Sequence, residues 1–417
     1  MTPAEPVEDF AARAGAWIDA NLPGWDETRI DDRTLQNRIY DAGFGGLAFP
    51  REYGGAGLTL QHHQAFYDTA DGLDRQVPRQ YWVSIGMIAP LLLQRGSGRL
   101  KQRMLRPLLR GDVICVQLLS EPRGGSDLAG VTTRLTRDGD HYVLSGSKMW
   151  STNAYLADYG MCLARSDWEV PKHRGLSMIL VPLKDTPGVA LRRTRMADGT
   201  LGDVCEEFFD EVVLPMENLV GEENDGWSVA HTLMVHERNQ TADIGYGRLG
   251  GKGRSTTMVV DRTSTAAELA AAASRHERLD LHAEAIADVY IDSVVSRLTG
   301  ERIIRGMELG THQGQWGSVG KLMGSEDGHR AALTTLAVSG ADAVVWDGDD
   351  EQVDRAGSSW LTARTATIGG GTSEIQRNII SERLLGLPRE PSSDRDIPFK
   401  DVLRNAAKLG RPVRGES

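Results

Sequence analysis

The chain has 417 residues, a formal net charge of −11 and a charged fraction of 25%. This length exceeds the roughly 100–200 residues of a typical domain, and the hydrophobic fraction of 40% is close to the globular average, which excludes a disordered or fibrous chain. The acidic balance excludes a general nucleic-acid surface, because phosphate binding requires a concentrated basic face.

Cysteine usage and the N-terminal residues predict a cytoplasmic protein. Cys115, Cys162 and Cys205 are widely spaced and form no Cys-x-x-Cys pair, so neither a disulfide framework nor a zinc site is indicated. The His62-His63 pair lacks a third ligand at a suitable spacing, and we expect no metal. The first residues lack the basic and apolar regions of a signal peptide, and no run approaches the about 18 apolar residues of a membrane helix. We therefore expect a reduced compartment and no membrane span.

The spacing of apolar residues divides the chain into helical, β-rich and helical parts. Residues 1–112 carry apolar side chains at intervals of three and four, which predicts an N-terminal helical domain. Residues 113–222 contain short β-type runs such as HYVLSG and SMILVPL, which predict a central β-domain. Helical spacing returns over 223–390, and 391–417 is expected to be an extended tail. The expected fold class is therefore α+β, with domains that share one packed body.

A motif after the first predicted strand carries the clearest functional signal. It reads QLLSEPRGGSDLAG and, with the turn FPREYGGAGLT and later segments, it resembles the acyl-CoA dehydrogenase family over residues 43–388. In that family the motif wraps the flavin and the thioester end of the substrate. The resemblance implies that Leu119 and Ser120 contact the flavin and that Ser126 faces CoA. Arg123 departs from the usual glycine and adds a cation near the expected CoA path.

A second motif, GSKMWSTNAYLADY, resembles the family's second flavin-contacting strand. The likeness implies that Trp150 packs on the dimethylbenzene side of the ring, that Thr152 offers a hydroxyl to flavin N5, and that Ser151 belongs to the cofactor contacts. The Asp138-Gly139 pair lies between the two motifs and predicts a hairpin with a type I′ turn, because Asp-Gly suits positive φ angles. A core tryptophan beside a surface threonine is the alternative interpretation, and the nearby first motif disfavours it.

The segment TIGGGTSEIQRNIISERLLGLPRE resembles the family's last flavin-contacting loop and helix. By this likeness Thr372 and Glu374 contact the pyrophosphate-adenosine half of FAD. A glycine-rich turn that opens a helix suits phosphate, because its free N–H groups point outward. Many family members carry the catalytic glutamate where this chain has Gly370. The backbone N–H of Gly370 would still donate to the thioester oxygen, and its missing side chain leaves space for a branched or bulky acyl group.

The catalytic base is therefore expected elsewhere. In a second set of relatives it projects from the helix after the β-domain within a Glu-Arg dipeptide, which here is Glu237-Arg238. Trp227, Met234 and Glu237 fall on one helical stripe, which places the carboxylate on the apolar face. Burial makes an ionised carboxylate a stronger base, as the α-proton of a thioester requires. Arg238 resembles the arginine that reaches CoA in the family, and a Glu237 engaged in a salt bridge with Arg238 is the alternative.

The resemblance implies an FAD-dependent acyl-CoA dehydrogenase with an N-terminal helical domain, a central β-barrel or sandwich and a C-terminal four-helix bundle. Glu237 would remove the α-proton while the β-hydride passes to the flavin, giving a trans-2-enoyl-CoA in lipid or steroid side-chain catabolism, as in fatty acid β-oxidation. The implied partners are an acyl-CoA substrate, an electron-transfer flavoprotein as acceptor, and further subunits. The assembly would be a homodimer, a homotetramer or a heteromer with a related chain.

Two departures from the family pattern leave other functions open. Gly370 is the first, and the second is the absence of an Arg-x-x-Phe-Gly segment, since ASRHERLDLHAEA offers only Arg275 or Arg278 to the FAD diphosphate. Both favour a non-catalytic partner subunit of a heteromeric enzyme. A flavin-dependent oxidase or monooxygenase on the same fold is a third interpretation. The identity of the acyl group does not follow from the motifs, because side chains on several helices shape the substrate site.

Overall fold

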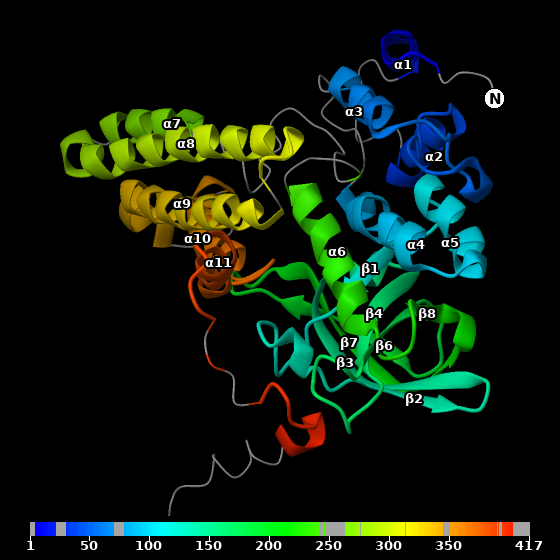
Figure 1. Ribbon diagram of the computed structural model, residues 1–417. Helices are drawn as coiled ribbons and strands as arrows, with labels where there is room; N and C mark the ends of the chain where they lie inside the picture. Colours follow the sequence, from blue (N-terminus) through cyan, green and yellow to red (C-terminus); the bar gives the residue numbers. More distant parts are fainter. Residues whose placement is uncertain are drawn as a thin grey trace, which may run out of the picture.

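The computed structural model describes residues 5–21, 31–70, 79–241, 246, 263–275, 277–312, 314–344, 351–389, 391 and 394–402. Helices precede and follow a central sheet (Figure 1). The helices are α1 (Val7–Asn21), α2 (Asp32–Asp41), α3 (Leu60–Thr69), α4 (Ala89–Arg95), α5 (Gly98–Arg110), α6 (Gly226–Thr241), α7 (Thr263–Arg275), α8 (Leu279–Glu308), α9 (Gly317–Ser339), α10 (Glu351–Ala363) and α11 (Ser373–Ile379). The strands are β1 (Cys115–Leu118), β2 (Arg134–Asp138), β3 (His141–Thr152), β4 (Tyr159–Arg165), β5 (Leu176–Pro182), β6 (Val189–Arg195), β7 (Leu201–Pro215) and β8 (Leu219–Val220).

The N-terminal helices form because their apolar residues recur once per turn. In α1, Phe10, Ala14 and Ile18 are buried at four-residue spacing, and the ring of Phe10 packs 5.9 Å from that of Phe44. His62 is part of this packing: its Nδ1 lies 2.7 Å from the Thr59 hydroxyl, and its Nε2 lies 2.8 Å from a backbone carbonyl. Its ring nitrogens therefore have structural partners.

The strands form a mixed sheet in the order β6-β7-β3-β2-β4-β5-β8, with β1 parallel to β4. The predicted hairpin joins β2 to β3, where Asp138 pairs with His141. Its two turn residues are Gly139 and Asp140, and Gly139 alone of the two has a positive φ, of 58°. The expected type I′ turn is therefore wrong, because that turn requires a positive φ at both positions, whereas a glycine at the first position is typical of type II′.

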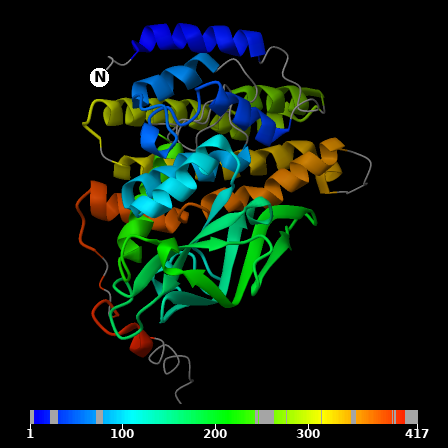
Figure 2. The same ribbon diagram turned by 90° about the vertical axis from the view of Figure 1, so that its right-hand side faces the viewer.

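The C-terminal helices α7, α8, α9 and α10 pack side by side (Figure 1). Small residues on α9, including Gly320 and Gly324, allow close approach, and Asp327 on α9 accepts a hydrogen bond from Ser296 on α8. Within 391–417, the described residues 394–402 return to the β-domain and begin a helical turn at Phe399 (Figure 2). They are therefore folded against the protein, which the expected extended tail did not anticipate.

The hydrophobic core crosses the boundaries between helices and sheet. One cluster joins Phe10 and Phe44 of the N-terminal part to Leu144 and Ile179 of the sheet. A second cluster joins α4 and α5 to β4, β5 and α6. The expected α+β class and the shared body are both confirmed, because burial continues from helix to strand without an intervening solvent layer.

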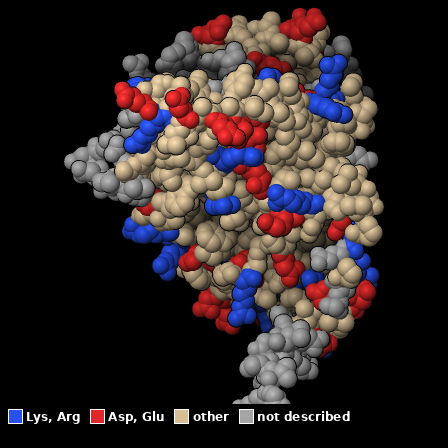
Figure 3. All heavy atoms as spheres, turned by 90° about the vertical axis from the view of Figure 1, so that its left-hand side faces the viewer, with Lys and Arg blue, Asp and Glu red and all other residues tan. Residues whose placement is uncertain are grey.

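The surface and the helix lengths bear on possible environments. On the face in Figure 3, lysine and arginine side chains are interspersed with aspartate and glutamate. Among the described residues, no helix combines the length and apolar composition that crossing a bilayer requires. Within the same residues, no three His, Cys, Asp or Glu side chains gather as a metal ion would need.

Candidate active site

Helix α6 lies directly on the sheet and carries Glu237. It begins at Gly226, where a Cβ atom would come within 2.6 Å of the Ser177 backbone in β5, so the lack of a side chain permits close contact. Ala230 and Leu233 are fully buried on the face that packs against the strands. Glu237 follows one turn later and is partly buried. The expected helical stripe thus brings the carboxylate to the interface of helix, sheet and C-terminal loop.

The Glu237 carboxylate lies beside Gly370. A Cβ atom added to Gly370 would be 3.8 Å from Oε1 of Glu237 and 3.5 Å from Cε of Lys321. Burial raises the pKa of Glu237 above its ordinary value, and the charge of Arg238, a hydrogen bond with the Gln117 side chain and the charge of Lys321 reduce this rise. The carboxyl group therefore sits where a proton is held more tightly than in water but cations still favour ionisation.

Gln117 is a site residue that motif comparison missed. It lies in β1, two residues before Leu119, and its side chain contacts the Glu237 carboxylate. Its Oε1 atom is buried and has no hydrogen-bond partner in the part of the chain that the structure describes. A polar residue within the apolar run CVQLL was the available signal, because buried amides are retained where they have a specific partner.

The two motifs of the β-domain meet at the ends of their strands. The backbone N–H of Met149 donates to the Ser120 carbonyl at 3.0 Å. The ammonium group of Lys148 donates to the Leu119 carbonyl at 2.9 Å. Residues 119–120 and the end of β3 are therefore adjacent, although about 30 residues separate them in the chain. The predicted flavin contacts from both motifs lie next to each other in space.

Trp150 sits at a β-bulge. The pairing of β3 with β7 shifts between Met149 and Ser151, and Trp150 has a φ of 71°. This backbone turns the indole outward, so that 53% of Trp150 is exposed, and Thr152 is also exposed. Positive φ is costly for a bulky residue and is found where a side chain must be redirected.

Ser151 faces the opposite side of β3 from Trp150 and Thr152. Its side chain is buried, and its hydroxyl donates to Oε2 of Glu207 at 3.1 Å. The side chain is thus engaged inside the β-domain, and Ser151 has only its backbone to offer at the outer face. The bulge at Trp150 shifts the alternation of side chains by one residue, so that Lys148 and Ser151, three positions apart, are both buried.

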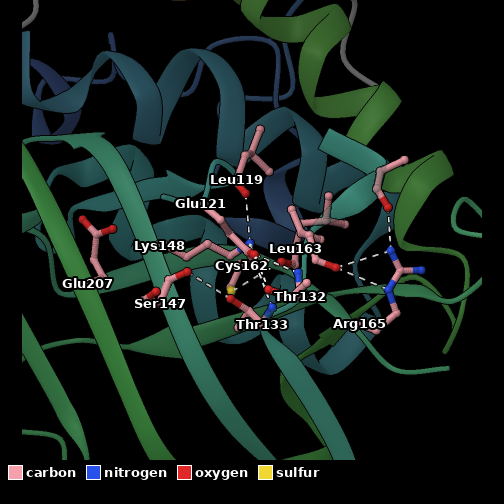
Figure 4. A network of polar contacts seen from close by, with 12 residues as sticks. Leu119, Glu121, Thr132, Thr133, Ser147, Lys148, Cys162, Leu163, Arg165 and Glu207 are labelled. Atoms are coloured by element: carbon pink, nitrogen blue, oxygen red, sulfur yellow. Dashed lines mark hydrogen bonds and ion pairs between the residues drawn. The ribbon is translucent and has the colours of Figure 1, made fainter. Parts of the chain in front are cut away.

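A buried ion pair supports the first motif from inside the β-domain (Figure 4). Lys148 lies 3.0 Å from Glu121, and the carboxylate also accepts bonds from the backbone N–H groups of Thr132 and Thr133 at 2.7 and 2.8 Å. Burial would raise the pKa of Glu121, but the Lys148 charge and these donors outweigh it and lower the pKa. The network ties both ends of the 119–133 loop to β3.

Glu207 on β7 is another buried residue that the sequence motifs did not predict. Burial raises the pKa of Glu207 to about 8, although the Ser151 bond and the Lys148 charge act in the opposite direction. Its Oε1 atom is buried without a hydrogen-bond partner among the described residues. The signal in the sequence was the alternation of Cys205, Glu207 and Phe209 along the strand, which places the three side chains on one face.

The Gly370 loop leads into α11 as expected. Gly370 and Gly371 have φ angles of 68° and 91°, and the Gln376 side chain donates to the Gly370 carbonyl at 2.8 Å. Thr372 caps the helix by accepting a hydrogen bond from the Ile375 N–H at 3.2 Å. Glu374 is exposed in the first turn. The hydroxyl predicted to contact FAD therefore already serves the helix end.

The remaining predicted contacts occupy two places. Ser126 is exposed on the 119–133 loop, and Arg238 is partly buried, with a pKa that burial lowers and the Glu237 charge raises. The ring of His231 packs 4.9 Å from that of Trp227. His236 is buried, and this burial lowers its pKa. Both histidines therefore have packing roles beside the helix face that carries Glu237.

Comparison with known proteins decides the family. Models of the N-terminal, middle and C-terminal domains of acyl-CoA dehydrogenases match residues 4–112, 117–212 and 224–385. The chain belongs to the acyl-CoA dehydrogenase family. Members of this family are flavoproteins and oxidoreductases. The resemblance inferred from the motifs is thereby confirmed, together with the acyl-CoA dehydrogenase-like fold.

Two relatives come from Mycobacterium tuberculosis. The chain is 31% identical over 407 residues to the acyl-CoA dehydrogenase IpdE1, covering 93% of this chain and 99% of IpdE1. It is 35% identical over 303 residues to the acyl-CoA dehydrogenase FadE34, covering 72% of this chain and 39% of FadE34. Among solved structures, the Tcur3481-Tcur3483 steroid ACAD matches with a TM-score of 0.70 and 25% identity, covering 94% of this chain and all of that one. The ChsE4-ChsE5 complex from M. tuberculosis matches with a TM-score of 0.68 and 24% identity over 94% of this chain and 100% of that chain, a likeness of fold.

Proposed function

We propose that this chain is an FAD-dependent acyl-CoA dehydrogenase that converts an acyl-CoA thioester to a trans-2-enoyl-CoA, with Glu237 as the base. The position of Glu237 is the observation that carries the proposal. Its carboxylate is partly buried, has a raised pKa and lies beside Gly370, at the loop where many family members carry their base. A hydrogen bond with Gln117 ties it to the strand that leads into Leu119 and Ser120.

The outer face of the β-domain suits a flat aromatic cofactor. The strained bulge holds the side chain of Trp150 outward, and its indole is about half exposed. A flat ring system stacked on this indole would cover it. Thr152 is exposed beside it, and the N-terminus of α11 presents backbone N–H groups that suit a phosphate. When bound, FAD would supply the acceptor for a hydride, which carries two electrons. Trp150, Thr152 and Thr372 are the residues that we propose to hold it.

The protein's own chemical task is removal of the α-proton. Glu237 must be ionised to accept it, and its raised pKa makes the carboxylate a stronger base than one in water. Arg238 and Lys321 supply positive charge that keeps part of the population ionised. The backbone N–H of Gly370 is the proposed donor to the thioester oxygen, where negative charge grows as the proton leaves.

The absence of a side chain at Gly370 supports a bulky acyl substrate. Within 4 Å of an added Cβ atom there lie only Lys321 Cε and Glu237 Oε1, so the space is open on the remaining sides among described residues. The similar Tcur3481-Tcur3483 structure is described as a steroid ACAD, which agrees with a bulky acyl group in the substrate. Arg238 and the exposed Ser126 are the proposed contacts to CoA, and an electron-transfer flavoprotein is the proposed acceptor. A panel of straight, branched and steroid side-chain acyl-CoA thioesters would identify the substrate.

The test of the base is anaerobic reduction of the bound flavin by an acyl-CoA, followed by its visible absorbance. We expect Glu237→Gln to fold and retain flavin but to bleach roughly 100- to 10,000-fold more slowly, because loss of a general base costs about two to four orders of magnitude. Glu268→Gln is the control, because Glu268 is exposed on α7, and it should bleach at the wild-type rate. Unchanged bleaching in Glu237→Gln would remove Glu237 as the base.

A non-catalytic partner subunit is the second candidate function. It is supported by the packing of Arg278, whose guanidinium lies over Gly340 within this chain's own helical bundle and is therefore placed for a structural role. The similar ChsE4-ChsE5 structure is described as a complex, and the similar Tcur3481-Tcur3483 structure carries two protein names. The visible spectrum of the chain purified alone separates the candidates. Absence of flavin absorbance would favour the partner role.

A further inference from the structure

The 119–133 loop, which carries Ser126 and the predicted flavin contacts, is held by a buried arginine from another strand. Arg165, at the end of β4, is fully buried, and burial lowers its pKa to about 10. Its guanidinium, which Figure 4 draws, donates to the carbonyls of Ala129 and Lys172 at 2.5 Å each, and to the Val131 carbonyl at 3.4 Å. The position of the loop thus depends on where this guanidinium lies.

Arg165 also contacts Phe399, which belongs to the C-terminal segment 394–402. The guanidinium carbon lies 3.9 Å from the centre of the Phe399 ring, and Phe399 itself is 2% exposed. A planar guanidinium over an aromatic face is a favourable contact that gains strength when water is excluded. Trp168 encloses the same ring at 5.5 Å.

Backbone and ionic contacts fix the segment to the loop after β4. The Phe399 N–H donates to the Val170 carbonyl at 2.9 Å. Lys172, from this same loop, lies 2.8 Å from Asp394 and 3.1 Å from Asp127, so one ammonium group joins the C-terminal segment to the 119–133 loop. The side chain of Lys172 is partly buried in these ion pairs, so solvent screens its charge less than at an open surface.

The same loop after β4 also reaches α6. The ring of His173 packs 4.9 Å from that of Trp227, in the first turn of the helix that carries Glu237. In Figures 1 and 2 the segment lies at the β-domain, away from α7 and α8. The loop after β4 therefore connects the segment to the elements that bear the two sides of the candidate site.

We propose that the segment 394–402 is a positioning strap for the substrate-carrier side of the site. Phe399 and Asp394 hold Arg165 and Lys172, and these two cations hold Asp127, Ala129 and Val131 of the 119–133 loop. The link from this loop to the thioester carrier rests on the proposed function. Phe399 and Asp394 act through Arg165 and Lys172 and are positioning residues.

The first test measures amide hydrogen exchange in the full chain without substrate. In Phe399→Ala we expect exchange of residues 123–131 to rise roughly tenfold, because loss of a desolvated cation–π contact makes local opening of the loop more frequent. Phe399→Tyr keeps the aromatic face and should restore slow exchange. Unchanged exchange over 123–131 in a folded Phe399→Ala protein would overturn the strap, and so would an equal rise over the whole β-domain.

The second test separates KM from kcat with an acyl-CoA that the wild type accepts. Phe399→Ala should raise KM roughly fivefold to tenfold with kcat within about twofold, because the part of the loop that Arg165 and Lys172 hold, residues 127–131, lies on the proposed carrier side. Asp394→Asn should raise KM by a smaller factor, and Asp396→Asn, an exposed neighbour on the same segment, should leave it unchanged. A fall in kcat with constant KM would contradict the assignment.

The two tests keep this inference apart from the proposed function. If no acyl-CoA is turned over by the wild type, the proposed function fails, and the exchange measurement still decides whether the strap holds the loop. If Phe399→Ala does not fold, Asp394→Asn against Asp396→Asn provides the same comparison in exchange and KM. Equal exchange over 123–131 in these two variants would overturn the proposal.

Discussion

At the residue scale, Glu237 and Gln117 form a pair in which an amide tunes the proton affinity of a carboxyl group. Burial raises the pKa of Glu237 and the Gln117 hydrogen bond opposes that rise. Removing the amide should therefore raise the pKa further, so that less carboxylate is present at any acidic pH. The pH dependence of turnover therefore measures how the Gln117 contact affects the pKa of Glu237.

We predict that Gln117→Leu shifts the rising limb of kcat/KM to higher pH. Activity on the acidic limb should fall several-fold, whereas the plateau at high pH should stay within about twofold, because the base is fully ionised there. The measurement is a pH profile of kcat/KM between pH 5 and 9. Gln240→Leu is a matched control, because Gln240 lies on α6, the helix of Glu237, but its side chain donates to the Trp82 carbonyl. A limb that moves equally in both variants would contradict a specific role for Gln117.

Glu207 is a buried carboxyl group whose titration should affect stability. Its pKa of about 8 in the folded protein lies above the ordinary value of 4.5. Below pH 4.5 both the folded and unfolded chains hold the proton, so its stabilising effect is fully present. As the pH rises toward 8 the unfolded chain releases the proton while the folded chain retains it, and the stabilisation is progressively lost.

We therefore predict that Glu207→Gln weakens this pH dependence. At pH 8 the variant should be more stable than the wild type by on the order of 4 kcal/mol, and at pH 5 the difference should be about 1 kcal/mol or less, because glutamine resembles the protonated acid. Urea unfolding at both pH values measures the difference. Glu206→Gln on the neighbouring position of β7 is the control. If Glu207→Gln changed the free energy of unfolding by the same amount at pH 5 and at pH 8, Glu207 would be ionised in the folded wild type at both pH values.

At the element scale, the bulge in β3 stores backbone strain beneath an exposed indole. Trp150 has a φ of 71°, which costs a bulky residue roughly 1–2 kcal/mol, and more than half of the residue is exposed. Stability alone would favour glycine at this position. A tryptophan that is both strained and exposed is the kind of conflict that marks a ligand contact.

Trp150→Gly should accordingly separate stability from cofactor retention. The flavin-free variant should unfold with a free energy equal to or up to about 1 kcal/mol above that of the wild type, because the strain is relieved and little buried area is lost. The same variant should lose flavin more readily on dilution. Trp150→Ala keeps a Cβ atom and should lose flavin without the gain in stability. A large loss of stability in Trp150→Gly would contradict this account.

At the scale of the whole molecule, the site depends on how closely α6 approaches the sheet. Gly226 is the first residue of α6, and a Cβ atom there would come within 2.6 Å of three backbone atoms of Ser177. Backbone atoms cannot rotate away as the end of a side chain can. A larger residue would therefore move the helix and, with it, Glu237 relative to Gly370.

We predict that Gly226→Ala destabilises the protein by about 1–3 kcal/mol, as overpacking does, and lowers kcat/KM by more than tenfold. Gly98→Ala is the matched control, because Gly98 also opens a helix but has nothing within 4 Å of an added Cβ atom. That control should be neutral or slightly stabilising, since alanine favours helix. Thermal unfolding and steady-state kinetics measure both effects. A neutral Gly226→Ala would show that α6 can move without loss.

The sequence by itself determined the family, the order of helical and β-rich parts, and the candidate residues that lie within continuous motifs. Helical spacing placed Glu237 on the packed face of α6, and the Gly-Thr-Ser loop placed Thr372 at the start of a helix. These features are local, because a period of 3.6 or 2 residues and a cap depend on neighbours within a few positions.

Only the tertiary structure decided which distant residues meet. Gln117 reaches Glu237 from a strand more than 100 residues away, Glu207 turns inward beneath Ser151, and Phe399 lies over Arg165. Each of these contacts depends on strand register and on close packing between elements, which no short stretch of sequence encodes. The physical reason is that burial and charge, which set the proton affinity of a side chain, belong to the assembled interior rather than to the chain.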